Sequence, residues 1–457
     1  MTDTTGSTYT AQLKAALTGR PDAPFVWLCN FEVEERWAQG YPGLPAARVA
    51  GAAPTVQRME ELGALLADPS DHLLLDQHLA PAFRAYADRI GLGAPAELVT
   101  PAPAGPGGTS QAVLDSPELL ARLGKIAADG GYLMPMGTSA AEQKIAEATG
   151  LRLAVPAADT FERVNSKIYS RRLVDELGLR AVPGFCCETT GELRRALTEG
   201  IADGPLIVKD AYGVSGKGLV VLDGPAKAER LLRMADRRAR RTGDDALHVV
   251  VERFLPKEAD LNYQFTIDRT GQVRFDFVKQ ALTEGGVHLG HLMPADLTEG
   301  QRHQLRDAAE RIGARLFHDG FFGVVGVDAL LGADGLLYPV LEINARLNMS
   351  SYQGRITERF AGPKSHALAR HYPLRLRREV SFEEVTSALG PLAAPPTGGT
   401  GAVLTCFGTV NAQAGTASPF PGRLYALLVA PGRAELHALD RRITEALRPL
   451  DTAGSTP

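Results

Sequence analysis

The chain has little of what marks a secreted, disulfide-stabilised protein. Its 457 residues include only four cysteines, at Cys29, Cys186, Cys187 and Cys406. They lack the spacing of paired metal ligands, and the vicinal pair Cys186–Cys187 is unsuited to an ordinary disulfide framework. This usage is typical of a reducing cytoplasm, so we expect a cytoplasmic protein.

Long apolar runs and a basic excess are also missing. No run approaches the roughly 18 apolar residues that a membrane helix needs, and residues 1–14 lack the basic-then-apolar pattern of a signal peptide. The net charge is −4, with 49 basic and 53 acidic residues, which argues against a nucleic-acid binder. We interpret the basic run Arg233–Arg241 as a solvated helix face. We therefore expect neither a membrane nor a nucleic acid as partner.

What is present is an ordinary globular composition in a chain long enough for about three domains. Hydrophobic residues make up 44% and charged residues 22%. Short apolar strands alternate with helical patterns from Pro24–Asn30 to Tyr132–Met136. This alternation predicts an N-terminal α/β domain, residues 1–155, built on a parallel sheet.

A second domain is expected over residues 156–375. The capping pair Asp159-Thr160 predicts a helix over Phe161–Leu177. A glycine loop, Tyr212–Gly218, joins two predicted strands, Leu206–Lys209 and Leu219–Leu222, in a subdomain at about 200–258.

The rest of the chain holds further helices and a terminal unit. The apolar spacing over Thr298–His318 predicts an amphipathic helix. A helix is also expected over Glu358–His371, and Gly390–Gly401 has the composition of a linker. Residues 376–457 then predict a small C-terminal α/β domain. It would hold two strands and a helix, at Ala402–Phe407, Leu424–Val429 and Arg433–Leu447.

The most informative stretch is Phe322–Ser351, which predicts two strands joined by a Gly-Ala-Asp-Gly turn. Alternation along the second strand places Glu342, Asn344 and Arg346 on one side. Asp328 lies in the first strand. An odd loop length, or a bulge, would bring Asp328 and Glu342 to the same face.

Two carboxylates, an amide and a guanidinium on one wall suit Mg²⁺ and a polyphosphate. The alternative is an ordinary hairpin with one polar, solvated face. The hairpin alone does not choose between them.

The glycine loop is not a Walker A motif, because it precedes a strand and lacks the final Gly-Lys-Ser/Thr. Its glycines allow the backbone to approach an anion, and Ser215 and Lys217 supply donors. A glycine hairpin with no ligand is the alternative. Lys209 ends an apolar strand, which favours contact with a buried anion over simple solvation.

Six separated elements occur in the order seen in one family. They are Lys167 in a helix, Ile-Val-Lys209, the glycine loop, Val-Glu252-Arg-Phe-Leu, Val-Asp328-Ala-Leu, and Leu-Glu342-Ile-Asn344-Ala-Arg346. Over roughly residues 150–375 this order resembles the ATP-grasp carboxylate–amine ligases, and the N-terminal segment resembles their pre-grasp domain. More narrowly, the whole chain resembles the pheganomycin-type peptide ligases.

The resemblance implies a fold and a set of site residues. The fold would be α/β, with a pre-grasp domain, a central ATP-grasp domain of two subdomains and a small C-terminal domain. Metal binding would fall to Asp328, Glu342 and Asn344, and Arg346 would steady the transferred phosphoryl group. ATP contacts would come from Lys167, Lys209, Gly213, Ser215, Gly216, Lys217, Glu252, Arg253, Leu255, and Glu258 or Asp260 at the ribose.

The function implied is ATP-dependent joining of an amino-acid-like carboxylate to the amine of a peptide, in peptide-antibiotic biosynthesis. ATP and Mg²⁺ would be required, with Mn²⁺ as a substitute. The partners would be a small-molecule carboxylic acid and a peptide, and a homodimer is compatible with the resemblance. Two alternatives stay open: a dipeptide or other carboxylate–amine ligase of the same fold, and a non-catalytic nucleotide-binding protein. No general base is identifiable, and we interpret His288 and His291 as structural or surface residues.

Overall fold

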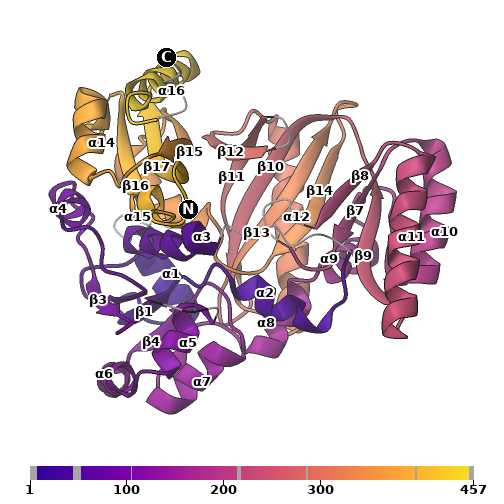
Figure 1. The fold of residues 1–457 in the computed structure, drawn as a ribbon, viewed down its shortest axis with the longest axis horizontal. Helices are drawn as coiled ribbons and strands as arrows, with labels where there is room; N and C mark the ends of the chain where they lie inside the picture. The colour runs from indigo at the N-terminus through magenta and orange to yellow at the C-terminus, as the bar shows by residue number, and fades with distance from the viewer. Residues whose placement is uncertain are drawn as a thin grey trace.

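The computed structural model describes residues 8–44, 53–103, 105, 107–213, 218–284, 287–396 and 399–451. They form three sheets with helices packed around them (Figure 1). Within these residues, no helix is both long and apolar enough to cross a membrane.

The N-terminal segment holds a five-stranded parallel sheet, as predicted. Its order is β3-β2-β1-β4-β5. The strands are β1 (Phe25–Leu28), β2 (His72–Leu75), β3 (Ala96–Val99), β4 (Tyr132–Pro135) and β5 (Arg152–Leu153). Every residue of β1 is buried, which suits a strand covered on both faces of a parallel sheet. The surrounding helices are α1 (Tyr9–Thr18), α2 (Val33–Trp37), α3 (Ala53–Arg58), α4 (Pro81–Arg89), α5 (Gly108–Leu114), α6 (Pro117–Ala128) and α7 (Ala140–Thr149).

A four-stranded antiparallel sheet carries the glycine loop, on the right in Figure 1. Its order is β6 (Gly184–Thr189), β9 (Ala246–Arg253), β7 (Leu206–Asp210) and β8 (Leu219–Leu222). Helices α10 (Thr190–Gly200) and α11 (Pro225–Thr242) pack their apolar side chains against it. The subdomain therefore begins near 184, earlier than the expected 200, because β6 pairs with β9.

The largest sheet has eight strands, in the order β14-β13-β10-β11-β12-β15-β17-β16. The strands are β10 (Lys257–Ile267), β11 (Val273–Glu284), β12 (Val287–Met293), β13 (Gly323–Gly332), β14 (Leu337–Asn344), β15 (His366–Leu376), β16 (Gly401–Cys406) and β17 (Phe420–Ala430). The expected boundary at 375/376 falls at the end of β15, and the C-terminal strands continue the same sheet. The remaining helices are α12 (Glu299–His318), α13 (Gly354–Phe360), α14 (Phe382–Leu389), α15 (Gly408–Asn411) and α16 (Arg433–Leu447).

Two predicted helices are wrong in extent. The helix predicted over 161–177 is two helices, α8 (Ala158–Val164) and α9 (Lys167–Glu176). The break comes at Asn165, whose side chain donates to the carbonyl oxygens of Phe161 and Ala345 and so competes with helical pairing.

The helix predicted over 358–371 is the other error. Helix α13 ends at Phe360, and β15 begins at His366 after Gly362 and Pro363, which interrupt a helix. Strand β15 pairs with β12 on one side and with β17 on the other. Pairing on both sides outweighs the helix propensity of its Ala, Leu and Arg residues.

One buried carboxylate fastens the C-terminal strands to the N-terminal domain. Glu61 is fully buried and forms a salt bridge of 2.5 Å with Arg58. Its other oxygen accepts from the backbone N–H groups of Phe407, at 3.1 Å, and Gly408, at 2.8 Å. These contacts join segments about 346 residues apart in sequence.

We expect Glu61→Ala to destabilise the protein strongly. The substitution removes the nearest carboxylate of the buried Arg58 and the acceptor of two backbone N–H groups, a loss of about 3–5 kcal/mol. Chemical unfolding of the variant measures it. Glu147→Ala, at an exposed site within α7, is the matched control and should change the unfolding free energy by less than about 0.5 kcal/mol. Equal stability of the two variants would contradict the anchoring role of Glu61.

Candidate active site

The two carboxylates of the predicted hairpin lie directly opposite one another. Asp328 on β13 pairs with Glu342 on β14, and the register shifts between Asp328 and Leu330. Leu331 pairs with Leu337, so an odd number of residues lies between the paired positions, and this loop length puts the two carboxylates on one face. The predicted shared face is therefore confirmed, and the register shift sets the two residues directly opposite one another. Directly opposed residues of an antiparallel pair project to the same side of the sheet.

Asp328 is held by amides from both neighbouring strands. Asn262 on β10 donates to its Oδ1 at 2.8 Å, and Asn344 on β14 donates to its Oδ2 at 3.2 Å. Burial raises the pKa of Asp328 to about 6, with the nearby charge of Glu342 as the second cause. The Oδ1 atom of Asn262 is buried without a hydrogen-bond partner among the described residues.

Glu342 is paired with the lysine that opens α9. Lys167 Nζ lies 2.6 Å from Glu342 Oε1 and donates to the carbonyl oxygen of Gly213 at 3.0 Å. Its own backbone N–H donates to the carbonyl oxygen of Ala211, just after β7. Lys167 therefore connects the carboxylate wall to the start of the glycine loop.

Arg346 lies against a carboxylate from the N-terminal domain. Its Nε donates to Glu34 Oε1 at 2.6 Å, and its Nη2 donates to Asn344 Oδ1 at 2.9 Å. The side chains of Arg346 and Glu34 are only 10% and 9% exposed, so this is a largely buried ion pair. Because Arg346 occupies Asn344 Oδ1, that oxygen is engaged here in orienting the arginine.

A second buried ion pair lies in the glycine-loop subdomain. Lys209 Nζ is 2.6 Å from Glu252 Oε2, and the two residues come from paired strands β7 and β9. Arg253, next in sequence, donates to the carbonyl oxygens of Gly200 and Asp203. Leu255 packs beside a small apolar cluster that includes Val182. Lys167 on α9 and Lys209 on β7 are thus both held by carboxylates, Glu342 and Glu252.

The remaining predicted residues divide into three groups. On β10, Asp260 forms an ion pair with Lys257, and Glu258 is exposed. His291 on β12 is buried. Ser215, Gly216 and Lys217 lie outside the described residues, and so does the side chain of His288.

Sequence reasoning missed Glu34, Asn262 and the buried Lys279. Asn262 pairs across β10 and β11 with Lys279, so Glu342, Asp328, Asn262 and Lys279 form one row over four strands. A signal for Asn262 was present, because polar residues alternate with apolar ones along Leu261–Ile267. Nothing in the local sequence around Glu34 indicates that it reaches Arg346.

The row fits a Mg²⁺ ion better than it fits a transition metal. Among the described residues there is no group of three or more His, Cys, Asp or Glu that could hold a metal. Mg²⁺ in polyphosphate sites needs only one or two carboxylates, because phosphate oxygens and water complete its shell. Two desolvated carboxylates facing one another are also costly without a cation between them. Asp328 and Glu342 would hold the ion, with Asn262 and Asn344 orienting Asp328.

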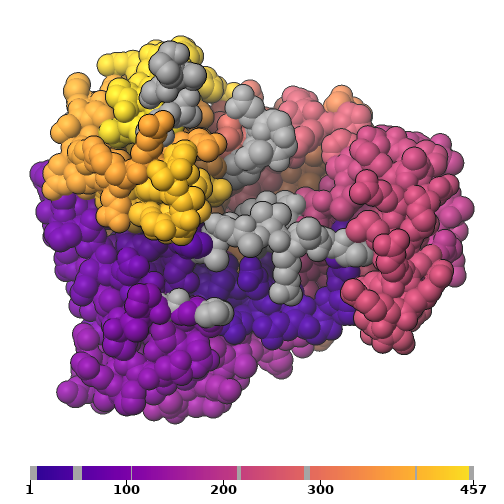
Figure 2. Space-filling model, viewed as in Figure 1, coloured from indigo at the N-terminus to yellow at the C-terminus, as the bar shows by residue number. Residues whose placement is uncertain are grey.

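The surface is hollowed between the glycine-loop subdomain and the N- and C-terminal segments (Figure 2). The row of Glu342, Asp328, Asn262 and Lys279 lies on the large sheet, Lys167 reaches it from α9, and Lys209 lies on β7 of the subdomain. The arrangement can hold a polyphosphate between two lysines, a guanidinium and a metal-binding wall.

The chain is similar to known proteins in both of its larger segments. The model of the pre ATP-grasp domain matches residues 59–151. The model of the carbamoyl-phosphate synthase L chain, ATP binding domain, matches residues 166–363. Over 199 residues the chain is 30% identical to the butirosin acyl-carrier protein–L-glutamate ligase of Niallia circulans, covering 43% of this chain and 46% of that protein. The matched part is thus less than half of that relative.

Solved structures share the fold. A biotin carboxylase from Campylobacter jejuni has a TM-score of 0.55 at 14% identity, covering 91% of this chain and 90% of that one. The N5-carboxyaminoimidazole ribonucleotide synthetase from Thermus thermophilus has a TM-score of 0.53 at 16% identity, covering 95% and 99%. The chain therefore carries a pre ATP-grasp domain followed by an ATP-grasp ATP-binding domain.

Proposed function

We propose that the protein is an ATP-dependent ligase that joins an amino-acid-like carboxylate to the amine of a peptide. The γ-phosphoryl group of ATP would pass to the carboxylate, and the amine would then displace phosphate from the acyl phosphate. The products are the amide, ADP and phosphate. The observation that carries the proposal is the opposed pair Asp328–Glu342, flanked by Lys167 and Arg346.

The chemistry explains why these residue types are needed. A carboxylate is a poor acyl donor, because its leaving oxide is very basic. Phosphorylation makes that oxygen a good leaving group. Phosphoryl transfer asks the protein mainly for positioning and neutralisation of charge. A bound Mg²⁺ would neutralise phosphate charge and polarise the transferred group.

The chain's own cations are held in ion pairs that a nucleotide could replace. Lys167 is paired with Glu342, and Lys209 with Glu252. Phosphate oxygens would take over these two lysines. Arg346 is held in place by Glu34 and Asn344, so its planar guanidinium is already oriented toward the wall.

The proposal also covers the amine that accepts the acyl group and the biological role of the reaction. The relative from Niallia circulans is named as a ligase that joins L-glutamate to an acyl-carrier protein of butirosin. That name supports an amino acid as the activated acid and a role in antibiotic biosynthesis. We favour a peptide amine as the acceptor. We also propose that the chain divides into domains at about residues 155 and 375.

Glu342→Ala should abolish acid-dependent ATP turnover. The substitution removes half of the metal wall, and we expect the rate to fall by about 100-fold or more. The assay contains Mg²⁺-ATP, each of the twenty proteinogenic amino acids in turn, and hydroxylamine, which traps an acyl phosphate as the hydroxamate. Hydroxamate, ADP and phosphate are the expected products. AMP and pyrophosphate would rule out the acyl-phosphate mechanism.

Lys209→Ala should raise the KM for ATP by about 10- to 100-fold, since one charge-assisted contact to phosphate contributes about 1.5–3 kcal/mol. The same assay, with ATP varied, measures it. Lys227→Ala is the control, because Lys227 is an exposed lysine on α11 with only a surface ion pair to Asp223. An unchanged KM in Lys209→Ala would remove this lysine from the phosphate site.

The requirement for Mg²⁺ should depend on pH. Below its pKa of about 6, Asp328 holds a proton that the metal must displace, so the Mg²⁺ concentration for half-maximal rate should rise as the pH falls through this value. Asn262→Ala removes a hydrogen bond that lowers the pKa of Asp328 and should move the midpoint to higher pH. Comparing the two proteins at the same ATP concentration cancels the protonation of ATP itself. Superimposable pH curves would exclude Asp328 as the metal ligand that titrates.

A further inference from the structure

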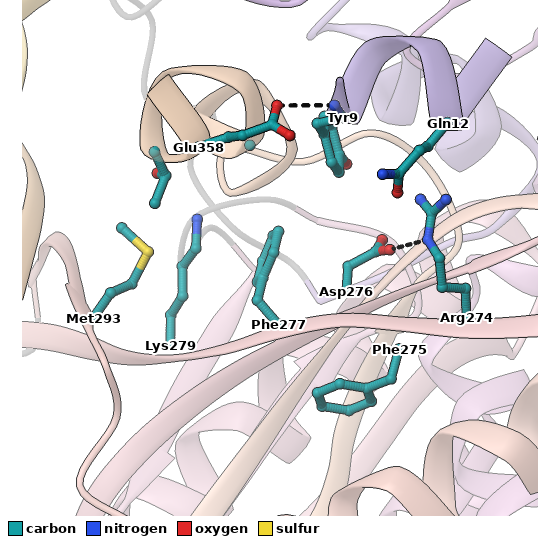
Figure 3. A pocket seen from close by; sticks show the side chains of 11 residues that line it. Tyr9, Gln12, Arg274, Phe275, Asp276, Phe277, Lys279, Met293 and Glu358 are labelled. Atoms are coloured by element: carbon teal, nitrogen blue, oxygen red, sulfur yellow. Dashed lines mark hydrogen bonds and ion pairs between the residues drawn. The ribbon is translucent and has the colours of Figure 1, made fainter. Parts of the chain in front are cut away.

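Lys279 stands at the end of the polar row, where a cavity opens over β11. The cavity, of about 320 Å³, lies between α1, α13 and the large sheet. Figure 3 shows Lys279 rising from β11 between Phe277 and Met293, with Glu358 of α13 and Tyr9 of α1 above the strand, where the Tyr9 backbone N–H donates to Glu358. Lys279 itself is only 1% exposed.

The contacts of Lys279 suit a neutral amine. Its Nζ donates to the carbonyl oxygen of Ser350 at 3.1 Å and to Gln353 Oε1 at 2.8 Å. It forms no salt bridge in the described part of the chain. A neutral amine has two N–H donors, which these two acceptors satisfy, and one lone pair that remains available. The third proton of an ammonium would face only the Phe277 ring, whose centroid is 4.2 Å away.

The surroundings of Lys279 explain why its neutral amine is favoured over the charged ammonium. Arg274 and Asp276 on its own strand, Tyr9 on α1, Glu358 on α13 and His291 on β12 are the titratable groups nearby. Burial is nevertheless the only cause that lowers the pKa of Lys279, and it lowers it well below the ordinary lysine value. Buried lysines with such pKa values serve as bases near neutral pH.

The position of Lys279 relates it to the proposed reaction. It directly opposes Asn262, which in turn opposes Asp328. Two strand spacings, about 10 Å between backbones, therefore separate Lys279 from the metal wall on one face. The turn that accepts its hydrogen bonds begins four residues after Arg346. One segment thus positions both the phosphate-binding arginine and this lysine.

We propose that the cavity admits the amine substrate and that Lys279 is the general base that deprotonates it. The lone pair of Nζ takes one proton from the attacking nitrogen. The new C–N bond forms as the bond from the acyl carbon to the phosphate oxygen breaks, and phosphate leaves. The lysine then returns the proton to solvent.

The cavity has the chemistry to hold a peptide. Arg274 Nη2 is buried without a hydrogen-bond partner among the described residues, and Thr357 Oγ1 is as well. Both residues line the cavity. A peptide carboxylate would satisfy the arginine, and Tyr9 and Phe277 offer aromatic walls. This inference rests on the proposed ligase function.

Lys279→Met tests the base and the ligase separately. Hydroxylamine is largely neutral at pH 7 and needs no base, so the variant should form hydroxamate from Mg²⁺-ATP and an amino acid at near the wild-type rate. Ligation of the same acid to a pool of dipeptides at pH 7 should fall by about 100-fold or more. The loss should shrink toward high pH, where the peptide amine is already neutral.

The outcomes are distinct. Failure of the wild-type protein to form hydroxamate would overturn the ligase function, whereas equal dipeptide ligation by wild type and variant would overturn the base. Lys144→Met, the same substitution at an exposed lysine of α7 outside the cavity, is the matched control and should keep both activities.

A second measurement is independent of activity. Because Lys279 has a lower pKa in the folded than in the unfolded protein, the folded state binds fewer protons between the two values. The Tm of the wild type should therefore rise relative to that of Lys279→Met as the pH rises toward about 10.4, the ordinary lysine pKa. Parallel Tm curves would show that Lys279 titrates normally, and the proposal would fail.

Discussion

The register between β13 and β14 is the constraint on which the rest of the site depends. Leu331 pairs with Leu337, so an odd number of residues joins the two strands and Asp328 and Glu342 share one face, and the register shift after Asp328 sets them directly opposite one another. An even number would have pointed one of them to the other side of the sheet. The cost of this arrangement is visible in the raised pKa of Asp328. Lys167 and Arg346 offset part of that negative charge, because Lys167 pairs with Glu342 and the charge of Arg346 lowers the pKa of Asp328.

The cations come from three separate parts of the chain. Lys167 opens α9 and reaches Glu342, and Arg346 follows β14 and is fixed by Glu34 of the N-terminal domain. Lys209 lies in the glycine-loop subdomain and is paired with Glu252. A nucleotide that enters between the sheets would exchange these internal partners for phosphate. The ion pairs therefore keep the cations in place without leaving buried charge unpaired.

Much of the metal wall and of the N-terminal sheet could be predicted from the sequence, because the residues involved lie close together along the chain. Asp328, Glu342, Asn344 and Arg346 lie within one short stretch of sequence, so strand alternation and an odd loop suffice to place them. The parallel N-terminal sheet likewise follows from alternating short elements. The predictions that failed concern segments whose structure depends on partners far away in the sequence. The segment at 366–376 is a strand only because β12 and β17 flank it.

The same distinction explains why Glu34 and Lys279 were missed. Glu34 meets Arg346 across 312 positions of sequence, and no pattern near it signals that contact. Lys279 lies in a strand whose side chains do not alternate regularly, because the register with β10 shifts between Gln264 and Phe265. That irregularity places Asp276 on the same face as Lys279, although an odd number of positions separates them. At the proposed amine site a one-residue bulge brings polar groups to one face, whereas at the metal wall the odd loop between β13 and β14 does so. The β10–β11 bulge thus gathers on one face of the sheet polar groups that a regular strand would have divided between its two faces.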